Sequence, residues 1–398
     1  MIFDTYTPQM VDVHVKTIME LIKRGKSKEQ IAKQLNLHDF DELCSVAKTR
    51  LTTTKTSEDY YLTEDDLRFA TNELVAQYRA KRLACDTLVD VGCGVGIQTI
   101  AFARTCKRVI AIDIDKRKIR YALENAKKVD ANNIEFIHAD GLKALQNLVG
   151  ADIVFVDPER APEEKVRSFD TSFRPPLRQL IDASRKLTPS IAIELPPQIQ
   201  KVDLDCEKEF ISVDHSLNRL TVYLGDLKRH ERSAVLLPGH HELTSDGSER
   251  PLRNSGALKY MFEVDPAVAK AGLSWKLGDE HTFLYSDERD TLLTSNTLLT
   301  STHLKARYEL VDAVENKFED ILAVLMWENA GKVVLRQKLA PDKYWTERRK
   351  YESRLRGDKT LHVFVFAHEA LVCRKLEHER MDEPTRVMLG RMRPKASS

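Results

Sequence analysis

Long uninterrupted hydrophobic stretches are missing from this chain of 398 residues. No segment approaches the roughly 18 consecutive apolar residues that a membrane-spanning helix requires. The first ten residues, MIFDTYTPQM, also lack the basic region and apolar core of a secretory signal. We therefore expect a soluble protein that resides in the cytoplasm and has no membrane partner.

Paired cysteines are also missing. The six cysteines stand at positions 44, 85, 93, 106, 206 and 373, without a CxxC pair or zinc-finger spacing. This distribution predicts reduced thiols in a cytosol. The adjacent His240 and His241 would point to opposite sides of an extended chain, and no partner ligands follow them. We therefore expect no metal site.

An excess of either charge is the third absence. Lys and Arg number 62 and Asp and Glu 61, which leaves a formal net charge of +1. This balance excludes a protein that coats nucleic acid through its overall charge, so any such binding must come from a local patch. The length predicts two or three domains, each large enough to bury its own core. Oligomeric state cannot be inferred from these features.

A glycine-rich turn between two apolar runs dominates residues 87–115, TLVDVGCGVGIQTIAFARTCKRVIAIDID. Residues 87–91 and 108–112 have the β-branched character of buried parallel strands, and residues 98–104 have helical spacing. Three glycines at alternate positions suit a chain that leaves a strand, bends sharply and lets a ligand touch its backbone. Asp113 closes the second strand, where an acid can accept hydrogen bonds from both ribose hydroxyls of an adenosine ligand.

The position of Asp90 indicates which adenosine ligand the glycine-rich turn binds. An acid two residues before the first glycine would repel a pyrophosphate but could hold an ammonium group. The DxGxGxG pattern resembles the first motif of class I S-adenosylmethionine-dependent methyltransferases, and Asp113 matches the acid of their second motif. A nicotinamide enzyme, or a glycine turn that only packs a helix on a sheet, remains the alternative. The cofactor residues implied by this resemblance are Asp90, Gly92, Gly94, Gly96, Gln98, Asp113 and Ile114.

After Asp113 the chain keeps alternating helices and strands, as an α/β doubly wound sheet requires. Helices are predicted over 116–128, 142–148 and 177–187, and strands over 134–138, 151–156, 190–195 and 234–237. Residues 209–215 and 220–225 read as an antiparallel hairpin with its turn at 216–219. The predicted fold is a Rossmann-like class I methyltransferase with a seven-stranded sheet and an antiparallel terminal hairpin. In that family the acid after the third strand accepts a hydrogen bond from the adenine amine, which assigns Asp140 and Gly141 to the cofactor; a cap for the helix that follows is the alternative for Asp140.

The fourth strand ends in Asp157-Pro158-Glu159-Arg160, which in class I enzymes faces the transferred methyl group. A backbone made rigid by Pro158 can hold Asp157 at a fixed distance from an acceptor atom. Enzymes that methylate an exocyclic base amine usually have Asn or Asp, two prolines and an aromatic here; Glu159 and Arg160 replace the last two. Arg160 could still stack on a base or bind a phosphate. We predict Asp157, Pro158 and Arg160 as the catalytic set, with a simple strand-ending turn as the alternative.

The first 85 residues read as helical. Residues 11–23 are amphipathic, and capping boxes are predicted at 27–30 and 39–42. Two short helices with a tight link can form a DNA-reading helix-turn-helix, but plain bundle helices fit better because no basic residues crowd the early turns of the second helix. Thr63 is expected to cap one helix that runs through Leu67, Ala70, Leu74 and Tyr78. This helix could lie over the cofactor. Its pair Ala70-Thr71 resembles a stretch that leads into the core of related methyltransferases, and an ordinary mid-helix hydroxyl is the alternative for Thr71.

A stretch rich in Gly, Ser and charge at 239–256 marks a domain boundary. Beyond it we predict an α+β domain with a helix at 307–325 and strands at 332–335 and 361–366. Residues 332–359 hold ten Lys or Arg, Lys338 among them, against four acids, with Tyr344, Trp345 and Tyr351 interleaved. This composition suits phosphate neutralisation and base stacking, although a solvated helical face is the alternative. The residues expected to contact RNA are Tyr344, Trp345, Arg348, Arg349 and Lys350.

Two segments give a narrower resemblance. SLNRLTVYLGDLKR at 216–229 resembles the closing hairpin of the trimethylguanosine synthase group of RNA methyltransferases. MFEVDPAVAKAGL at 261–273 resembles prokaryotic relatives of that group that carry a THUMP-like C-terminal domain. Together with the helical pattern and the boundary at 239–256, this resemblance predicts three regions, namely a helical region at 1–85, the methyltransferase domain at 86–245 and a THUMP-like domain at 257–398.

The function implied by this resemblance is transfer of a methyl group from S-adenosylmethionine to a base of tRNA or rRNA, at nitrogen. Two other readings stay open. The chain could be a nucleic-acid-binding regulator that retains a cofactor fold, or a methyltransferase for a protein or small molecule.

Overall fold

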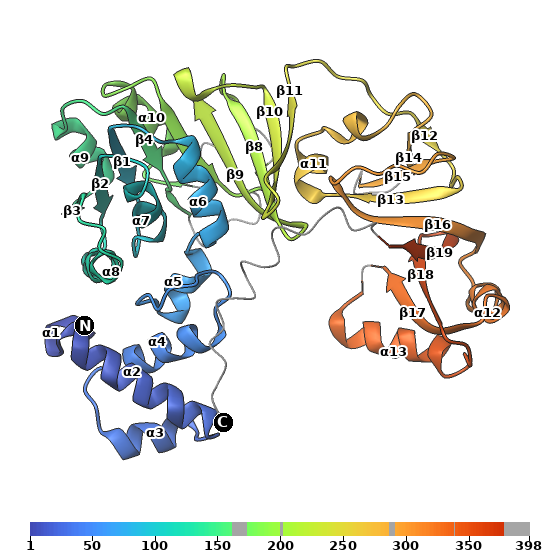
Figure 1. Ribbon diagram of the computed structural model, residues 1–398, viewed down its shortest axis with the longest axis horizontal. Helices are drawn as coiled ribbons and strands as arrows, with labels where there is room; N and C mark the ends of the chain where they lie inside the picture. Colours follow the sequence, from blue (N-terminus) through green and yellow to red (C-terminus); the bar gives the residue numbers. More distant parts are fainter. Residues whose placement is uncertain (161–172, 200–201, 286–290, 338, 378–398) are drawn as a thin grey trace. The chain divides into compact units, whose positions relative to one another are not determined.

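A computed structural model of the chain describes residues 1–160, 173–199, 202–285, 291–337 and 339–377 (Figure 1). It divides into two compact units. The first comprises Met1–Glu209 and Arg219–Glu231, and the second comprises Phe210–Asn218 and Arg232–Ser398. No helix in the part described is long and apolar enough to cross a membrane.

Helices precede the first sheet, as expected. Ser27 forms the predicted capping box with Gln30, but Asp39 does not cap its helix, because its backbone is left-handed (φ 49°) and its side chain accepts a hydrogen bond from Thr5 instead. The six helices are α1 (Ile2–Thr5), α2 (Pro8–Lys23), α3 (Lys28–Leu35), α4 (Phe40–Thr52), α5 (Glu64–Phe69) and α6 (Glu73–Arg82).

The single helix predicted after Thr63 is wrong. Thr63 does form a capping box with Asp66, but the helix ends at Phe69 and a second one begins after Asn72. Asn72 caps this second helix by accepting a hydrogen bond from the Leu74 amide. Because Asn at an N-cap competes with a continuous helix, Ala70 and Thr71 become a connecting segment rather than mid-helix positions.

The first sheet has the order β11-β10-β8-β9-β7-β4-β1-β2-β3. The central strands β3, β2, β1, β4 and β7 are parallel, and β9 is antiparallel to β7. The strands are β1 (Thr87–Val91), β2 (Arg108–Asp113), β3 (Ile134–His138), β4 (Ile153–Val156), β7 (Ile191–Leu195), β8 (Glu207–Val213), β9 (Ser216–Leu224), β10 (Arg232–Leu237) and β11 (His241–Ser245). The predicted number of seven strands is too low, because β10 and β11 extend the same sheet.

The helices between these strands are α7 (Ile97–Ala103), α8 (Lys116–Lys128), α9 (Gly141–Asn147) and α10 (Leu177–Arg185), close to their predicted bounds. A short pair, β5 (Glu159–Arg160) and β6 (Phe173–Arg174), follows the fourth strand. The hairpin between β8 and β9 turns at Asp214 and His215, not at the predicted 216–219. Both residues have positive φ, at 48° and 55°, which is the backbone of a tight two-residue turn.

The parallel strands owe their positions to burial on both faces. All but the first residue of β1, and every residue of β4 and β7, are buried. Leu88, Val109 and Phe155 join Phe102 of α7 in one apolar cluster. This continuous burial explains why the apolar runs gave these strands correctly, and it places their carboxyl ends along one edge of the sheet.

The second sheet has the order β12-β14-β15-β13-β16-β19-β18-β17. Its strands are β12 (Asn254–Ser255), β13 (Tyr260–Val264), β14 (Phe283–Tyr285), β15 (Leu292–Ser295), β16 (Leu304–Glu315), β17 (Ala330–Arg336), β18 (Lys359–Val365) and β19 (Glu369–Leu376). The helices of this unit are α11 (Pro266–Lys270), α12 (Phe318–Trp327) and α13 (Pro341–Glu352).

The helix predicted at 307–325 is wrong. Residues 304–315 form a twelve-residue strand, and the helix occupies only the second part of that segment. Leu304, Ala306 and Tyr308 are buried at alternate positions, which is the pattern of a strand with one covered face.

Candidate functional site

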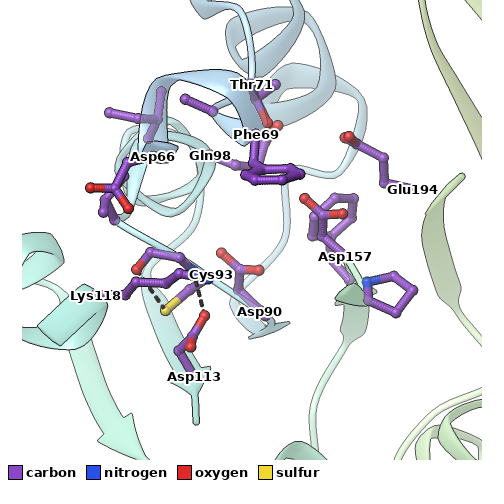
Figure 2. A pocket seen from close by; sticks show the side chains of 17 residues that line it. Asp66, Phe69, Thr71, Asp90, Cys93, Gln98, Asp113, Lys118, Asp157 and Glu194 are labelled. Atoms are coloured by element: carbon purple, nitrogen blue, oxygen red, sulfur yellow. Dashed lines mark hydrogen bonds between the residues drawn. The ribbon is translucent and has the colours of Figure 1, made fainter. Parts of the chain in front are cut away.

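A cavity of about 330 Å³ lies at the carboxyl ends of β1, β2, β4 and β7 (Figure 2). Doubly wound sheets bind ligands at this edge. Most of its lining comes from the ends of these strands, from the glycine-rich turn and from the segment between α5 and α6. The lining residues are Asp66, Phe69, Ala70, Thr71, Asp90, Gly92, Cys93, Gly94, Val95, Ile97, Gln98, Asp113, Lys118, Phe155, Asp157, Pro158 and Glu194.

The glycine-rich turn forms the floor of the cavity. The backbone φ of Gly92 is +86°, and a Cβ there would stand 2.3 Å from the backbone oxygen of Asp157. Gly94, with φ +55°, has no described atom within 4 Å of such a Cβ. One glycine therefore lets the turn touch the end of β4, and the other leaves space beside the cavity for a ligand to reach the backbone.

The Asp90 carboxyl group is 1 % exposed and lies at the end of β1. Its Oδ2 accepts a hydrogen bond of 2.6 Å from Thr99, whereas its Oδ1 has no partner among the described residues. Burial, with a smaller contribution from the nearby Asp113 carboxylate, raises the pKa of Asp90 to about 7. A buried acid with one free oxygen fits a cationic ligand group such as the ammonium of S-adenosylmethionine, because that group would satisfy the oxygen and stabilise its charge.

Asp113 stands opposite, at the end of β2. Its Oδ2 accepts the Gly94 amide at 2.8 Å, and its Oδ1 accepts the Asp115 amide at 2.8 Å. The carboxylate thus fixes the second glycine of the turn. Each oxygen has a second lone pair, so the same group can also accept bonds from ligand hydroxyls. This arrangement suits the ribose of an adenosine ligand.

Asp157 and Pro158 line the cavity at the end of β4. The Asp157 amide donates to the Val91 carbonyl at 2.9 Å, which fixes the residue against β1. Burial and the neighbouring Glu194 carboxylate raise the pKa of Asp157 well above its usual range. The third predicted catalytic residue, Arg160, has its backbone in β5, and its side chain lies outside what the structure describes.

Glu194, on β7, is a cavity residue that the sequence analysis missed. Its carboxylate is 6 % exposed and pairs with Arg79 at 2.8 Å and with Arg219. Arg79 is fully buried; it also donates to Gln98 and Thr221 and stacks over the Phe155 ring. An acid inside the otherwise apolar strand IAIEL is the signal that could have identified Glu194, because a buried acid needs partners.

Helix α5 and the segment that joins it to α6 cover the cavity. Asp66 forms a two-bond ion pair with Arg117 of α8, at 2.7 and 2.9 Å. The Lys55 ammonium donates to the carbonyls of Leu67, Arg68 and Ala70. Thr71 is buried and lines the cavity rather than lying in mid-helix. Sequence reasoning missed Asp66 and Phe69, because nothing in their local pattern links them to a glycine turn more than twenty residues away.

Five of the nine residues that the sequence assigns to the cofactor line the cavity, namely Asp90, Gly92, Gly94, Gln98 and Asp113. Four others do not. Gly96 packs α7 against Ala122 of α8; Ile114 is 62 % exposed; Asp140 caps α9 through the Lys143 amide; and a Cβ on Gly141 would meet Val91. Gln98 holds its amide group between Arg79 and the Ala76 carbonyl, which makes it a structural link as well as a lining residue.

The five predicted RNA contacts lie together on α13 in the second unit. Trp345 is 54 % exposed, with the Arg348 guanidinium 5.3 Å from its ring and Tyr344 against its edge. Arg348 pairs with Glu352 and Lys350 with Glu347 on the same helix. Tyr351 is buried in the core beneath, so it is not available for stacking. No group of three or more potential metal ligands occurs among the residues that the structure describes.

Two families match parts of the chain. The RNA cap guanine-N2 methyltransferase family matches residues 85–224, and the tRNA (uracil-5-)-methyltransferase family matches residues 10–148. An uncharacterized S-adenosylmethionine-dependent methyltransferase of Mycobacterium tuberculosis is 24% identical over 315 residues, which are 77% of this chain and 84% of the relative.

A shorter match and a solved structure complete the comparison. A 23S rRNA (uracil(1939)-C(5))-methyltransferase of Legionella pneumophila is 32% identical over 91 residues, 22% of this chain and 20% of that protein. The crystal structure of a putative methyltransferase from Porphyromonas gingivalis has a TM-score of 0.66 at 18% identity and covers 94% of this chain and 100% of its own. The two chains therefore share a fold.

Proposed function

We propose that this S-adenosylmethionine-dependent methyltransferase transfers its methyl group to a base of tRNA or rRNA. The observation that carries the proposal is the pair Asp157-Pro158 at the end of β4, in the same cavity as Asp90, Asp113 and the glycine turn. A methyl donor held by the turn would present its methyl group to a polar acceptor atom held by the acid.

Different residues would bind different parts of the cofactor. Asp90 would bind the ammonium group, Asp113 would bind the ribose hydroxyls, and the backbone at Gly94 would lie against the cofactor. S-Adenosylmethionine supplies the methyl group, and its sulfonium makes the transfer an in-line displacement. The remaining task of the protein is to place the acceptor and exclude water.

Asp157 would serve as the positioning acceptor for a substrate N–H. A base nitrogen is a poor nucleophile while its lone pair is delocalised into the ring. A fixed oxygen can hold the N–H in a geometry that frees this lone pair, and it can stabilise the positive charge that develops. Pro158 would keep that oxygen in place, and Arg160 would orient the base or a neighbouring phosphate.

The protonated thiol of a cysteine in the cavity favours a nitrogen atom over a carbon atom as the methyl acceptor. Methylation of the uracil C5 atom calls for a thiolate that adds to the ring first. Cys93 is the cysteine among the described lining residues; it belongs to the glycine turn, and burial raises its pKa well above its usual range. A protonated thiol in that position is poorly suited to this addition.

RNA is supported as the substrate class by the two family matches and by the composition of α13. The ion pair of Lys350 with Glu347 lies on the surface, where such pairs stabilise a protein by only about 0–1 kcal/mol, so it can be exchanged for a phosphate contact at little cost. The pair of Arg348 with Glu352 is half-buried. We also propose that residues 257–398 form a THUMP-like docking domain and that residues 86–245, with the trimethylguanosine synthase-like hairpin, carry the catalysis in the cytoplasm.

Tritium transfer from labelled S-adenosylmethionine tests this function. Purified protein is incubated separately with tRNA, with rRNA and with a protein extract, all from cells that lack the gene, and nucleoside mass spectrometry identifies the product. We expect label in one RNA fraction and a methylated base in it. Label confined to protein or to small molecules would overturn the proposal.

A further inference from the structure

Phe69 is the aromatic side chain that the cavity offers to a ligand. Among the residues that the structure describes, two aromatic ones line the cavity, Phe69 and Phe155. Phe155 is 1 % exposed and already lies against Phe102 and the Arg79 guanidinium, so its ring faces are occupied. Phe69, by contrast, is 61 % exposed at the end of α5. Figure 2 shows its ring among the labelled side chains of the cavity.

The backbone beneath this ring is held on several sides. Lys55 donates to the carbonyls of both neighbours, Arg68 at 3.3 Å and Ala70 at 3.2 Å, and Arg219 donates to the Phe69 carbonyl at 3.2 Å. Single exposed apolar side chains are common and need no explanation. Phe69 differs from such side chains, because it lies at the rim of a cavity on a backbone that two cations hold. Its position is therefore ordered before any ligand binds.

The anchors also show on which side of the cavity the ring lies. At the start of α5, Asp66 is bound to Arg117 of α8, on the side of β2 and of Asp113. At its end, the Phe69 carbonyl is bound to Arg219, whose side chain pairs with Glu194 on β7. Since β7 is the neighbour of β4 in the sheet, Phe69 lies toward the side of Asp157 and away from the proposed ribose site.

The turn at the end of β4 lacks an aromatic residue of its own, since Glu159 and Arg160 follow Pro158. From these observations we infer that Phe69 stacks on the base that accepts the methyl group, while Asp157 holds its N–H. This inference rests on the proposed function, because it assumes an RNA base as substrate. Stacking is the usual way in which proteins hold a base that is turned out of its strand. The Arg68 guanidinium, 5.5 Å from the ring centre, adds a cation beside the base.

Ring-retaining and ring-removing variants test the inference. We expect Phe69→Ala and Phe69→Leu to lower kcat/KM for the RNA fraction by about 5- to 100-fold, the range of one lost base stack. Phe69→Trp should keep most of the activity, and calorimetry should give S-adenosylmethionine affinities within about two-fold of the parent in all three. Val13→Ala, which shortens another apolar side chain that is 62 % exposed, is the matched control and should change neither quantity.

A second readout does not depend on turnover. Addition of the RNA fraction should quench the emission of Phe69→Trp beyond that of the parent, whose three tryptophans supply the background. If ring loss weakened cofactor affinity and left transfer at saturating cofactor unchanged, the ring would serve the adenine, and the inference would be overturned. Equal kcat/KM in Phe69→Ala and parent would also overturn it and leave the proposed function standing. A parent that labels no RNA would instead refute the proposed function and the inference together.

Discussion

Four of the five acids among the described lining residues of the cavity differ in their environment, and this difference separates their roles. Asp113 already accepts two backbone amides, and Glu194 is paired with two arginines. Asp90 and Asp157 have their pKa raised by burial. The first two thus fix the structure of the cavity, whereas the protonation of the last two responds to the ligand that binds.

Removal of the Asp113 carboxylate should weaken cofactor binding. Asp113→Ala leaves the ribose hydroxyls without an acceptor and frees the Gly94 amide, so we expect S-adenosylmethionine affinity to fall by roughly 10- to 100-fold. Isothermal titration calorimetry measures it. Asp86→Ala, which removes an exposed acid just before β1, is the control and should bind as the parent does. An unchanged dissociation constant in Asp113→Ala would contradict the assignment.

The raised pKa of Asp90 predicts a pH dependence. Since the pKa of about 7 in the folded protein lies above the ordinary aspartate value of 3.8, the free protein loses stability as the pH rises from about 4 through 7. An ammonium group beside Asp90 favours the ionised acid, so S-adenosylmethionine affinity should rise between about pH 6 and 7, with release of a proton on binding. Calorimetry in buffers of different ionisation enthalpy detects that proton, and Asp90→Asn should abolish both effects.

Loss of the Asp157 carboxyl group should separate binding from chemistry. Asp157→Ala is expected to keep S-adenosylmethionine affinity within a few-fold and to lower single-turnover methyl transfer by about 100-fold or more, the scale for one positioned polar group. Asp157→Asn, which keeps an acceptor oxygen, should retain more activity. Parental rates in Asp157→Ala would place the active site elsewhere.

At the scale of elements, the contact between the glycine turn and the end of β4 is testable. Gly92→Ala adds a Cβ within 2.3 Å of the Asp157 backbone oxygen, on a backbone with φ +86°. Gly25→Ala meets no described atom within 4 Å at a similar φ of +78°, so it reports the backbone strain alone. We expect Gly92→Ala to lower Tm further than Gly25→Ala and to reduce turnover, as measured by calorimetry and tritium transfer.

The elements that sequence predicts well are those with a single dominant pattern. The runs at 109–112 and 153–156 are apolar throughout, and Ser27 with Gln30 is a complete capping box. Errors occur where two patterns compete. Residues 304–315 are rich in helix formers such as Leu, Ala and Glu, yet their alternate burial makes them a strand. The cavity floor could be predicted because its residues adjoin the glycines, whereas Glu194, Arg79 and Phe69 reach it only through the folding of distant segments.

At the scale of the whole molecule, docking and catalysis should respond to different substitutions. Reversal of Arg348, Arg349 and Lys350 to Glu should weaken RNA binding and flatten its salt dependence, while cofactor affinity stays the same. Reversal of Lys16, Lys23 and Arg24, three exposed cations in the first unit, changes the net charge equally and is the control. Filter binding over a range of salt concentrations measures both. If the variant bound RNA as well as the parent at every salt concentration, α13 would be a solvent-exposed helical face and not an RNA contact.

The roof of the cavity has a consequence for how the chain can be divided. Asp66, Phe69, Ala70 and Thr71 precede β1, and Arg79 reaches from α6 to Glu194. A fragment that began at residue 86 would keep every glycine and acid of the floor, yet it would leave Glu194 without one of its buried partners and the donor open to water. We expect such a fragment to hydrolyse or release its donor rather than transfer the methyl group. Grafting this active site onto another protein would require that the helices before the first strand be transferred together with the sheet.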